Sequence, residues 1–350
     1  MSIPFSLYMS QSLYGENGYY TTPHRVGTKG DFYTSVSASK FFGGAIASYI
    51  LSLLEKGSLY LPLHIIEIGA DKGYLLGDIA LFLDALSQNV MQQCSFITIE
   101  PLDNLAQTQS AHFALLAKQT PLHFATYKDL NSAPQPKPQT SLFIISNELF
   151  DSFPCEVIHN NAMLHITQDS HIWRGIWQNI NAHTRSIIQT YKYPADYSGI
   201  MPLWEDFISS LGQFSKAYQQ CYLMSFDYGG YDQTHSLAFN PRFYLQHHVQ
   251  TLMDFLAQNG DFHTLYKKAD ITYDVNFTYL DTLLCNAGFE NVFRTSQARA
   301  LIEKMNILTL LESFATHQGF KAYFREIQKV KTLLHTMGER FVGICYTFKV

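Results

Sequence analysis

The run Ser146-Asn147-Glu148-Leu149-Phe150-Asp151-Ser152-Phe153-Pro154 gathers an amide, two acids and a proline directly after an apolar segment, 141–145. That apolar segment is typical of a buried strand. Polar groups are costly to bury without partners, so we expect these side chains to face a cleft and to form the candidate reaction site. Asn147 and Asp151 could instead cap the turn or helix that follows, and the sequence leaves both interpretations open.

A second group of residues has the spacing of a ligand-binding loop. A β-branched run that includes Glu67 predicts a strand over 64–68, and it leads through Gly69-Ala70-Asp71-Lys72-Gly73 into a helix from Leu75. Gly69 and Gly73 would let a ligand approach bare backbone at a helix N-terminus. A dinucleotide is disfavoured, because Asp71 stands at the middle glycine position of the dinucleotide fingerprint and would repel a pyrophosphate. A ligand with a ribose and a cationic centre fits better, although a plain tight connection is also compatible.

Further acids follow other predicted strands. Glu100 comes after a strand over 94–99, and a carboxylate at that edge of a sheet commonly accepts two hydrogen bonds from a ribose diol. Asp129 follows a predicted strand over 122–125 and is a candidate partner for an adenine amine. Asp227 follows a predicted strand over 221–226 and is a further candidate for the reaction site.

A loop before the first central strand is dense in hydrogen-bonding groups. It spans 27–35 and contains Gly30, Asp31, Phe32 and Thr34. Such a loop could fold over a ligand as a lid, or it could be a solvated connector.

Composition limits the classes of protein and of partner. The chain has 350 residues, 47% hydrophobic and 15% charged, which predicts a sizeable core in about two domains or in one domain with an insertion. With 24 basic and 29 acidic residues and no basic run, neither a nucleic-acid partner nor an anionic membrane partner is indicated. The cysteine and histidine spacings match no metal site. No apolar stretch reaches about 18 residues and no signal peptide is seen, so we expect a cytoplasmic protein without membrane insertion, of unknown oligomeric state.

The remaining elements suggest an inserted part. Alternating residues from Glu156 onward, with a turn at Asn160-Asn161, predict antiparallel strands. A helix is predicted over 202–219, another from Asp270 through Leu284, and a last strand over 340–348.

Seven motifs, taken in order along nearly the whole chain, resemble the MidA-like family of class I S-adenosylmethionine-dependent methyltransferases. That family includes the mitochondrial arginine methyltransferase that assists complex I assembly. The motifs are Gly18-Tyr19-Tyr20; Gly30-Asp31-Phe32 with Thr34-Ser35; Glu67-x-Gly69-x-x-x-Gly73-x-Leu75; Glu100; Asn147-Glu148-x-x-Asp151-x-x-Pro154; Asp227-Tyr228-Gly229; and Asp270-Ile-Thr with Val275-x-Phe277.

The resemblance implies an α/β fold: a Rossmann-like seven-stranded methyltransferase sheet with helices on both faces, plus an inserted, partly antiparallel β cap. Residues 1–60 would form a helical segment and lid loop, 61–155 and 221–350 the methyltransferase core, and 156–220 a cap on the substrate side.

The resemblance also implies roles for the candidate residues. The cofactor would be S-adenosylmethionine, with the loop at Gly30 to Thr34 closing over it and Glu100 binding its ribose. The substrate would be a protein arginine, for which the family suggests a respiratory complex I subunit. If the acceptor is a guanidinium, chemistry alone predicts that carboxylates hold it through charge-assisted hydrogen bonds. The cofactor contacts would be Gly30, Asp31, Phe32, Thr34, Glu67, Gly69, Ala70, Gly73, Glu100 and Asp129; the acceptor contacts would be Glu148 and Asp151, with Asp227 and Asn147 as further candidates.

Asp71 stands where the family pattern has glycine. Two functions therefore stay open: an active methyltransferase, or a binding or assembly factor whose cofactor site is impaired. A nicotinamide dehydrogenase fits less well, because the phosphate-binding glycines are missing.

Overall fold

The computed structural model describes residues 2–22, 35–120, 122–169, 172–191, 197–231 and 240–348. Contacts divide the chain into two compact units, each built from three segments. The accessory unit comprises Met1–Phe32, Phe150–Glu205 and Gly230–Thr278, and the sheet unit comprises Tyr33–Leu149, Asp206–Gly229 and Tyr279–Val350. Both units are thus assembled from stretches that lie far apart in the sequence.

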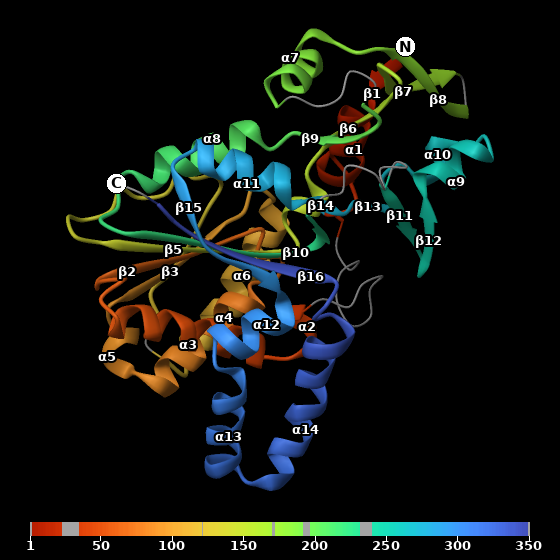
Figure 1. Ribbon diagram of the computed structural model, residues 1–350. Coiled ribbons are helices and arrows are strands. Elements are labelled where there is room, and N and C mark those ends of the chain that lie inside the picture. The colour runs from red at the N-terminus through yellow and green to blue at the C-terminus, as the bar shows by residue number, and fades with distance from the viewer. Residues whose placement is uncertain are drawn as a thin grey trace. The chain divides into compact units, whose positions relative to one another are not determined.

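The sheet unit contains a mostly parallel sheet with the strand order β15-β16-β10-β5-β2-β3-β4 (Figure 1). The pairs from β10 through β4 are parallel, whereas β16 is antiparallel to both β10 and β15. This sheet confirms the predicted fold class. Its strands are β2 (Leu63–Ile68), β3 (Cys94–Ile99), β4 (Phe124–Tyr127), β5 (Ser141–Asn147), β10 (Cys221–Gly230), β15 (Phe289–Ser296) and β16 (Phe341–Phe348).

Helices cover both faces of this sheet, with α3 and α4 on one face and α8 and α11 on the other (Figure 1). The apolar stripe of α4 accounts for its place, because Leu75, Ile79 and Leu83 are fully buried in the core. The helices are α2 (Ser35–Ala38), α3 (Phe41–Glu55), α4 (Tyr74–Leu86), α5 (Gln88–Met91), α6 (Asp103–Leu116), α8 (Glu205–Ser215), α11 (Phe277–Asn286), α12 (Gln297–Arg299), α13 (Ile307–Gln318) and α14 (Phe320–Lys331), with π turns at Ala300–Lys304 and Thr332–Thr336.

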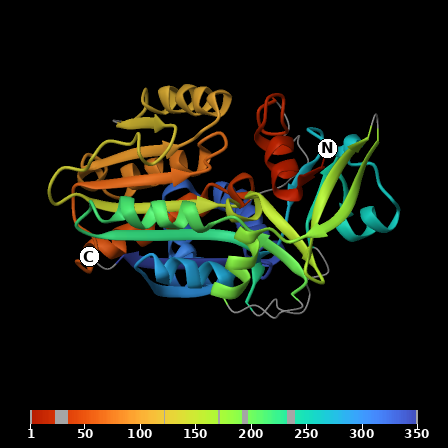
Figure 2. The ribbon, with the colours of Figure 1, turned by 90° about the horizontal axis from the view of Figure 1, so that it is seen from above.

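The described strand pairs of the two accessory sheets are all antiparallel, in agreement with the antiparallel part of the predicted fold. One sheet has the order β1-β7-β6-β9 with β8 paired to β7, and a second has the order β12-β11-β13. Figure 2 shows the long β7-β8 hairpin. The elements are β1 (Ser2–Pro4), α1 (Phe5–Tyr14), a 3-10 turn (Phe150–Ser152), β6 (Cys155–His159), β7 (Ala162–Asp169), β8 (Ile172–Asn179), α7 (Ala182–Thr190), β9 (Gly199–Pro202), β11 (Arg242–Leu245), β12 (His248–Thr251), α9 (Leu252–Ala257), α10 (Phe262–Leu265), β13 (Asp270–Thr272) and β14 (Val275–Asn276).

The turn between β6 and β7 agrees with the sequence prediction. Asn160 and Asn161 have φ values of +47° and +61°, and His159 pairs with Ala162 across them. Asparagine tolerates this left-handed region better than most residues, which explains the two-residue turn.

Two predicted elements are wrong in part. Asp270 does not open a helix: 270–272 and 275–276 are strands, and α11 begins at Phe277. Hydrogen bonding explains the strand, since 270–272 pairs antiparallel with β11 and this pairing overrides local propensity. The strand expected over 122–125 lies at Phe124–Tyr127, where it pairs with β3.

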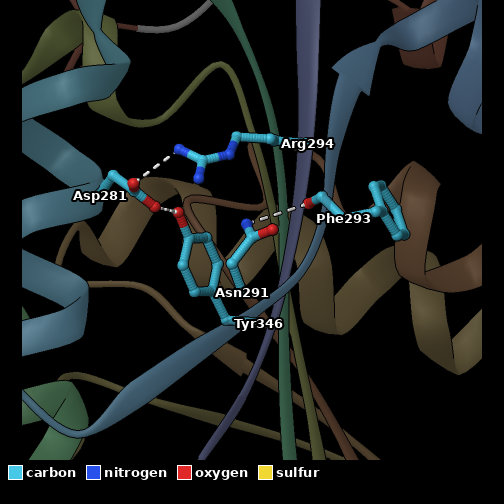
Figure 3. A network of polar contacts seen from close by, with 5 residues as sticks. All are labelled: Asp281, Asn291, Phe293, Arg294 and Tyr346. Carbon is cyan, nitrogen blue, oxygen red and sulfur yellow. Dashed lines mark hydrogen bonds and ion pairs between the residues drawn. The ribbon is translucent and has the colours of Figure 1, made fainter.

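A polar network links α11 to the last two strands of the sheet (Figure 3). Asp281 accepts a hydrogen bond from the Tyr346 hydroxyl on β16. It also forms an ion pair with the Arg294 guanidinium on β15, with 2.7 Å between Nη1 and Oδ2. Asn291 Nδ2 donates to the Phe293 carbonyl at 3.3 Å, beside the irregularity in the β15-β16 register. The network therefore fixes the antiparallel edge of the sheet against its covering helix.

We expect Tyr346→Phe to lower the free energy of unfolding by about 1–3 kcal/mol, because it leaves a charged acceptor without its buried donor. Tyr346 is 1% exposed, whereas the Arg294 side chain is 48% exposed. Arg294→Gln is the matched control, and it should cost about 0.2–1 kcal/mol, as exposed ion pairs do. Urea unfolding measures both, and equal losses would contradict this ranking.

Candidate active site

The loop after β2 presents bare backbone at the carboxyl edge of the sheet. Gly69 is exposed with φ +72°, and Gly73 has φ +77° and immediately precedes α4. A Cβ added at Gly69 would lie 2.9 Å from Leu149 Cδ1, and one at Gly73 would lie 2.6 Å from Phe113 Cε2. Both glycines are thus required by conformation and by close packing, and the buried Ala70 between them keeps the loop narrow.

Asp71 has a glycine-like backbone conformation, with φ +44°. Aspartate is one of the few side chains that enter this region at modest cost. Burial raises the pKa of its carboxyl group, partly offset by the charge of Lys72. The residue that departs from the family pattern therefore preserves the course of the loop.

Glu67 lies under this loop and is 3% exposed. Its Oε2 accepts a hydrogen bond from Leu76 N at 3.1 Å, in the first turn of α4. Burial, together with the nearby acids Asp71, Asp78 and Glu100, raises the pKa of Glu67 to about 8 despite the hydrogen bond from Leu76 N. The carboxyl group links β2 to α4 through this hydrogen bond, and its ionised form is destabilised by burial and by the neighbouring acids.

Glu100 follows β3 at the same edge of the sheet and is 5% exposed. Its Oε1 accepts a hydrogen bond from Leu102 N at 3.0 Å, and its Oε2 accepts one from Gln109 Nε2 at 3.1 Å. Burial raises the pKa of Glu100 to about 7 despite these two bonds. A carboxylate oriented at both oxygens, with lone pairs left over, suits a vicinal diol.

Near the carboxyl ends of β5 and β10, the side chains of Asn147, Glu148 and Asp227 lie at the same edge of the sheet, because these strands are parallel and Asn147 pairs with Phe226. Asn147 Nδ2 donates to Glu148 Oε1 at 3.0 Å, and Glu148 N donates to the Phe226 carbonyl at 2.9 Å. Glu148 has φ +52°, a conformation that costs a glutamate free energy and is often found at functional sites. The turn holds one partly exposed carboxylate in a fixed, strained position.

Asp227 supports this turn from β10. It is fully buried, and its Oδ2 and Oδ1 accept hydrogen bonds from Leu149 N at 3.1 Å and Tyr228 N at 2.9 Å. Leu149, in the same turn, approaches Gly69. Asp227 therefore joins the turn of Glu148 to its strand, and through Leu149 that turn abuts the glycine loop.

Other predicted site residues lie elsewhere. Asp129 is exposed, and its Oδ1 accepts a hydrogen bond from Ser132 N at 2.8 Å within a local turn. Asp151 belongs to the accessory unit, where its carbonyl accepts a hydrogen bond from Tyr273 N at 3.1 Å. Gly30, Asp31, Phe32 and Thr34 lie outside the described residues.

Within the accessory unit, two motifs from distant parts of the sequence meet. The Tyr20 hydroxyl donates to Asp270 Oδ1 at 2.9 Å, and Tyr14 stacks on Tyr20 with ring centroids 5.5 Å apart. Burial and the charge of Asp270 raise the pKa of Tyr20, so its hydroxyl stays protonated and can donate. The motif Gly18-Tyr19-Tyr20 and the motif that begins at Asp270 thus contact each other within this unit.

Gln109 on α6 is a site residue that the sequence did not reveal. It is fully buried, and its Nε2 donates both to Glu100 Oε2 and, at 2.9 Å, to the Asp71 carbonyl. A lone glutamine inside a helix carries no spacing signal, and only the three-dimensional structure brings it to the two loops.

The buried acids predict a pH-dependent stability. A folded-state pKa near 8 for Glu67 and near 7 for Glu100, against about 4.3 in the unfolded chain, means that the folded protein binds more protons between about pH 4.5 and 8. The free energy of unfolding should therefore fall as pH rises through that window. Glu67→Gln keeps an acceptor for Leu76 N and should gain about 1–3 kcal/mol at pH 8, with less gain at pH 5.

The control is the exposed Glu339→Gln on the same unit. Thermal unfolding at pH 5, 6.5 and 8 measures the difference. Equal effects of the two substitutions at pH 8 would contradict this account of Glu67.

Comparisons with known proteins agree with this geometry. A family model described as "Putative S-adenosyl-L-methionine-dependent methyltransferase" matches residues 45–294. The chain is 24% identical over 307 residues to "Protein arginine methyltransferase NDUFAF7 homolog, mitochondrial" of Caenorhabditis elegans, covering 79% of this chain and 66% of that protein. It is 26% identical over 157 residues to the human "Protein arginine methyltransferase NDUFAF7, mitochondrial", covering 39% and 34%. The matches thus span less than two thirds of these relatives' lengths.

The fold matches a crystal structure from Burkholderia thailandensis, described as that of a "likely methyl transferase" bound to S-adenosyl-homocysteine. The TM-score is 0.77 at 19% identity, and the match covers 99% of this chain and 87% of that one. A second crystal structure from the same organism gives a TM-score of 0.73.

The residues present fit the cofactor of such a family. The loop from Gly69 to Gly73 has two glycines in the left-handed conformation at the N-terminus of α4, and the oriented Glu100 carboxylate suits a ribose diol. Asn147 Oδ1 is buried and has no hydrogen-bond partner among the described residues, so it can accept a bond from a ligand.

Among the described residues, none of the helices has the length and apolar character of a membrane-spanning segment.

Proposed function

We propose that this chain, which belongs to a family of S-adenosyl-L-methionine-dependent methyltransferases, transfers a methyl group to an arginine side chain of a protein. The observation that carries the proposal is the turn after β5, where a strained, partly exposed Glu148 is held by Asn147 at the same sheet edge as Gly69 and Glu100. The named relatives are protein arginine methyltransferases, which supports an arginine acceptor.

Once bound, the cofactor would supply an electrophilic methyl group on a sulfonium, which a guanidinium nitrogen would take up, with the demethylated cofactor as the leaving group. We propose that Glu100 binds the ribose and that the backbone at Gly69 and Gly73 accommodates the methionine part. Glu148 would hold the guanidinium by charge-assisted hydrogen bonds and would accept the proton that the nitrogen loses. Positioning supplies most of the barrier reduction, since the transfer needs little other chemistry.

Asp227, with both carboxylate oxygens bonded to backbone N–H groups, would position Glu148 rather than touch the acceptor. Asn147 would orient the acceptor through Oδ1 while its Nδ2 holds Glu148. Asp151 stays a candidate for the acceptor-binding role, and the loop at Gly30, Asp31, Phe32 and Thr34 stays a candidate lid.

The test is mass spectrometry of arginine methylation in cells with and without this chain. The proposal would be supported if one methylated arginine is lost in cells without the chain, and if the wild-type gene restores that methylation but the Glu148→Gln variant does not. A subunit of respiratory complex I is the acceptor that we expect from the family resemblance. An unchanged arginine methylome would refute the arginine assignment, and a changed mark on another residue type would replace it.

Asp71 favours a second candidate, a binding or assembly factor with an impaired cofactor site. We expect Asp71→Gly to change the affinity for S-adenosyl-homocysteine only slightly, because Asp71 already has the backbone conformation that glycine would have. Isothermal titration calorimetry measures this. Binding by Asp71→Gly but not by the wild-type chain would favour the impaired site.

A further inference from the structure

Two loops of the candidate cofactor site are joined by one side-chain amide. Gln109 Nε2 lies 3.1 Å from Glu100 Oε2, after β3, and 2.9 Å from the Asp71 carbonyl, in the loop after β2. Gln109 sits on α6 and is fully buried. Each proton of its amide nitrogen is therefore used by a different loop.

The orientation of this amide follows from its neighbours. If oxygen and nitrogen exchanged places, an oxygen would face a carboxylate and a carbonyl, and both hydrogen bonds would be lost. Gln109 Oε1 has no hydrogen-bond partner among the described residues. The free-energy cost of this buried acceptor is offset by the two hydrogen bonds that Nε2 donates. The amide is thus held by the two loops rather than by its own oxygen.

Packing holds the rest of the side chain. A Cβ at Gly73 would lie 3.4 Å from Gln109 Cγ, so α6 packs directly on the glycine loop. One turn further along α6, Phe113 stacks on Phe124 of β4 with centroids 3.6 Å apart, which fixes the helix against the sheet. The amide cannot swing away without moving the loop that follows β2.

We propose that Gln109 is a positioning residue that couples the ribose end of the cofactor site to its methionine end. It turns the Glu100 carboxylate toward the ribose while it holds the glycine loop in its binding conformation. The inference rests on the proposed function, because it assumes that Glu100 and the glycine loop bind S-adenosylmethionine.

The charges around Glu100 support this role. Asp71 on the loop and Glu67 on β2 face Glu100, and both are acids. The Gln109 and Leu102 N–H groups lower the pKa of Glu100, whereas burial and Asp71 raise it. Without the amide, the carboxylate would ionise at a higher pH, and ligand binding would require more alkaline conditions.

The test is calorimetric titration of Gln109→Met with S-adenosyl-homocysteine between pH 6 and 8.5. Methionine is unbranched and of similar length, so it keeps the packing and removes both donor bonds. We expect the affinity to fall about tenfold at pH 7, as the loss of about 1.4 kcal/mol requires, and its rise with pH to shift upward. Gln107→Met, on the exposed side of the same helix, is the control.

Two further measurements separate positioning from a general loss of folding. In a Glu100→Gln background, Gln109→Met should cost much less than in the wild-type background, because the two residues act as a unit. Hydrogen exchange of the ligand-free protein should speed up at Gly69 to Gly73 in Gln109→Met, and in the repeat variant Gln109→Leu, but not in Gln107→Met.

The outcomes are distinct. If the wild-type chain binds S-adenosyl-homocysteine and Gln109→Met binds it with the same affinity and the same pH profile, the inference is overturned and the proposed function stands. Additive losses in the double variant would also overturn it. Failure of the wild-type chain to bind S-adenosyl-homocysteine would overturn the proposed function, and the coupling role with it.

Discussion

Glu148→Gln should lower the rate of methyl transfer by about 10²–10⁴ while leaving the affinity for S-adenosyl-homocysteine unchanged. The substitution keeps the shape of the side chain and removes the charge that would bind a guanidinium and accept its proton. Asn147 Nδ2, which donates to Glu148 Oε1 at 3.0 Å, could then face an amide nitrogen and lose its acceptor. Transfer of labelled methyl groups into a lysate of cells that lack the chain measures the rate, and calorimetry measures the affinity.

The left-handed conformation of Glu148 gives this experiment an internal check. Glycine at this position should relieve the strain of φ +52° and raise the free energy of unfolding by about 1 kcal/mol, while transfer is lost. A more stable but inactive Glu148→Gly cannot be explained by misfolding. The exposed Glu312→Gln is the control, and transfer retained in Glu148→Gln would remove Glu148 from the mechanism.

Glu100→Gln should weaken binding of S-adenosyl-homocysteine about 100-fold at pH 8, because two charge-assisted hydrogen bonds to a diol contribute about 3 kcal/mol together. In the wild-type chain, Glu100 has a pKa raised to about 7 by burial. A diol donates best to the ionised form, so affinity should rise with pH through that value and a proton should be released on binding. The variant should lose this rise.

Asp103→Asn is the matched control for Glu100→Gln, since Asp103 is exposed at the start of α6, close to Glu100 in the sequence. Calorimetry in two buffers of different ionisation enthalpy measures the released proton directly. If Glu100→Gln and Asp103→Asn bind equally well at pH 8, Glu100 does not hold the ribose.

The parallel strands could be predicted from the sequence because they are buried on both faces. Cys94–Ile99 has the predicted bounds, and the segments at 64–68, 141–145 and 221–226 all lie within observed strands. Such strands are continuous apolar runs, and their polar residues follow at the carboxyl ends. That is why Glu100 and the run from Asn147 were found.

The last strand was predicted at 340–348 and lies at Phe341–Phe348, but its neighbour β15 was missed for the opposite reason. Phe289–Ser296 is polar at most positions, with a mixed pattern of burial, and it is an edge strand whose place depends on pairing with β16. Gln109 was missed because a hydrogen bond between residues 38 positions apart in sequence leaves no local signal. Asp227 was found, but its two backbone partners could not be inferred from sequence.

The position of β16 within the sheet also has a consequence for synthesis on the ribosome. This strand, Phe341–Phe348, lies between β10 and β15, so β10 lacks β16 as a neighbour until more than a hundred further residues have been translated after Gly230. A nascent chain halted before Phe341 would carry the apolar strand Cys221–Gly230 paired with β5 but without β16 along its other edge, and such an open edge is a template for aggregation. We therefore expect the emerging chain to depend on chaperone binding until β16 leaves the exit tunnel.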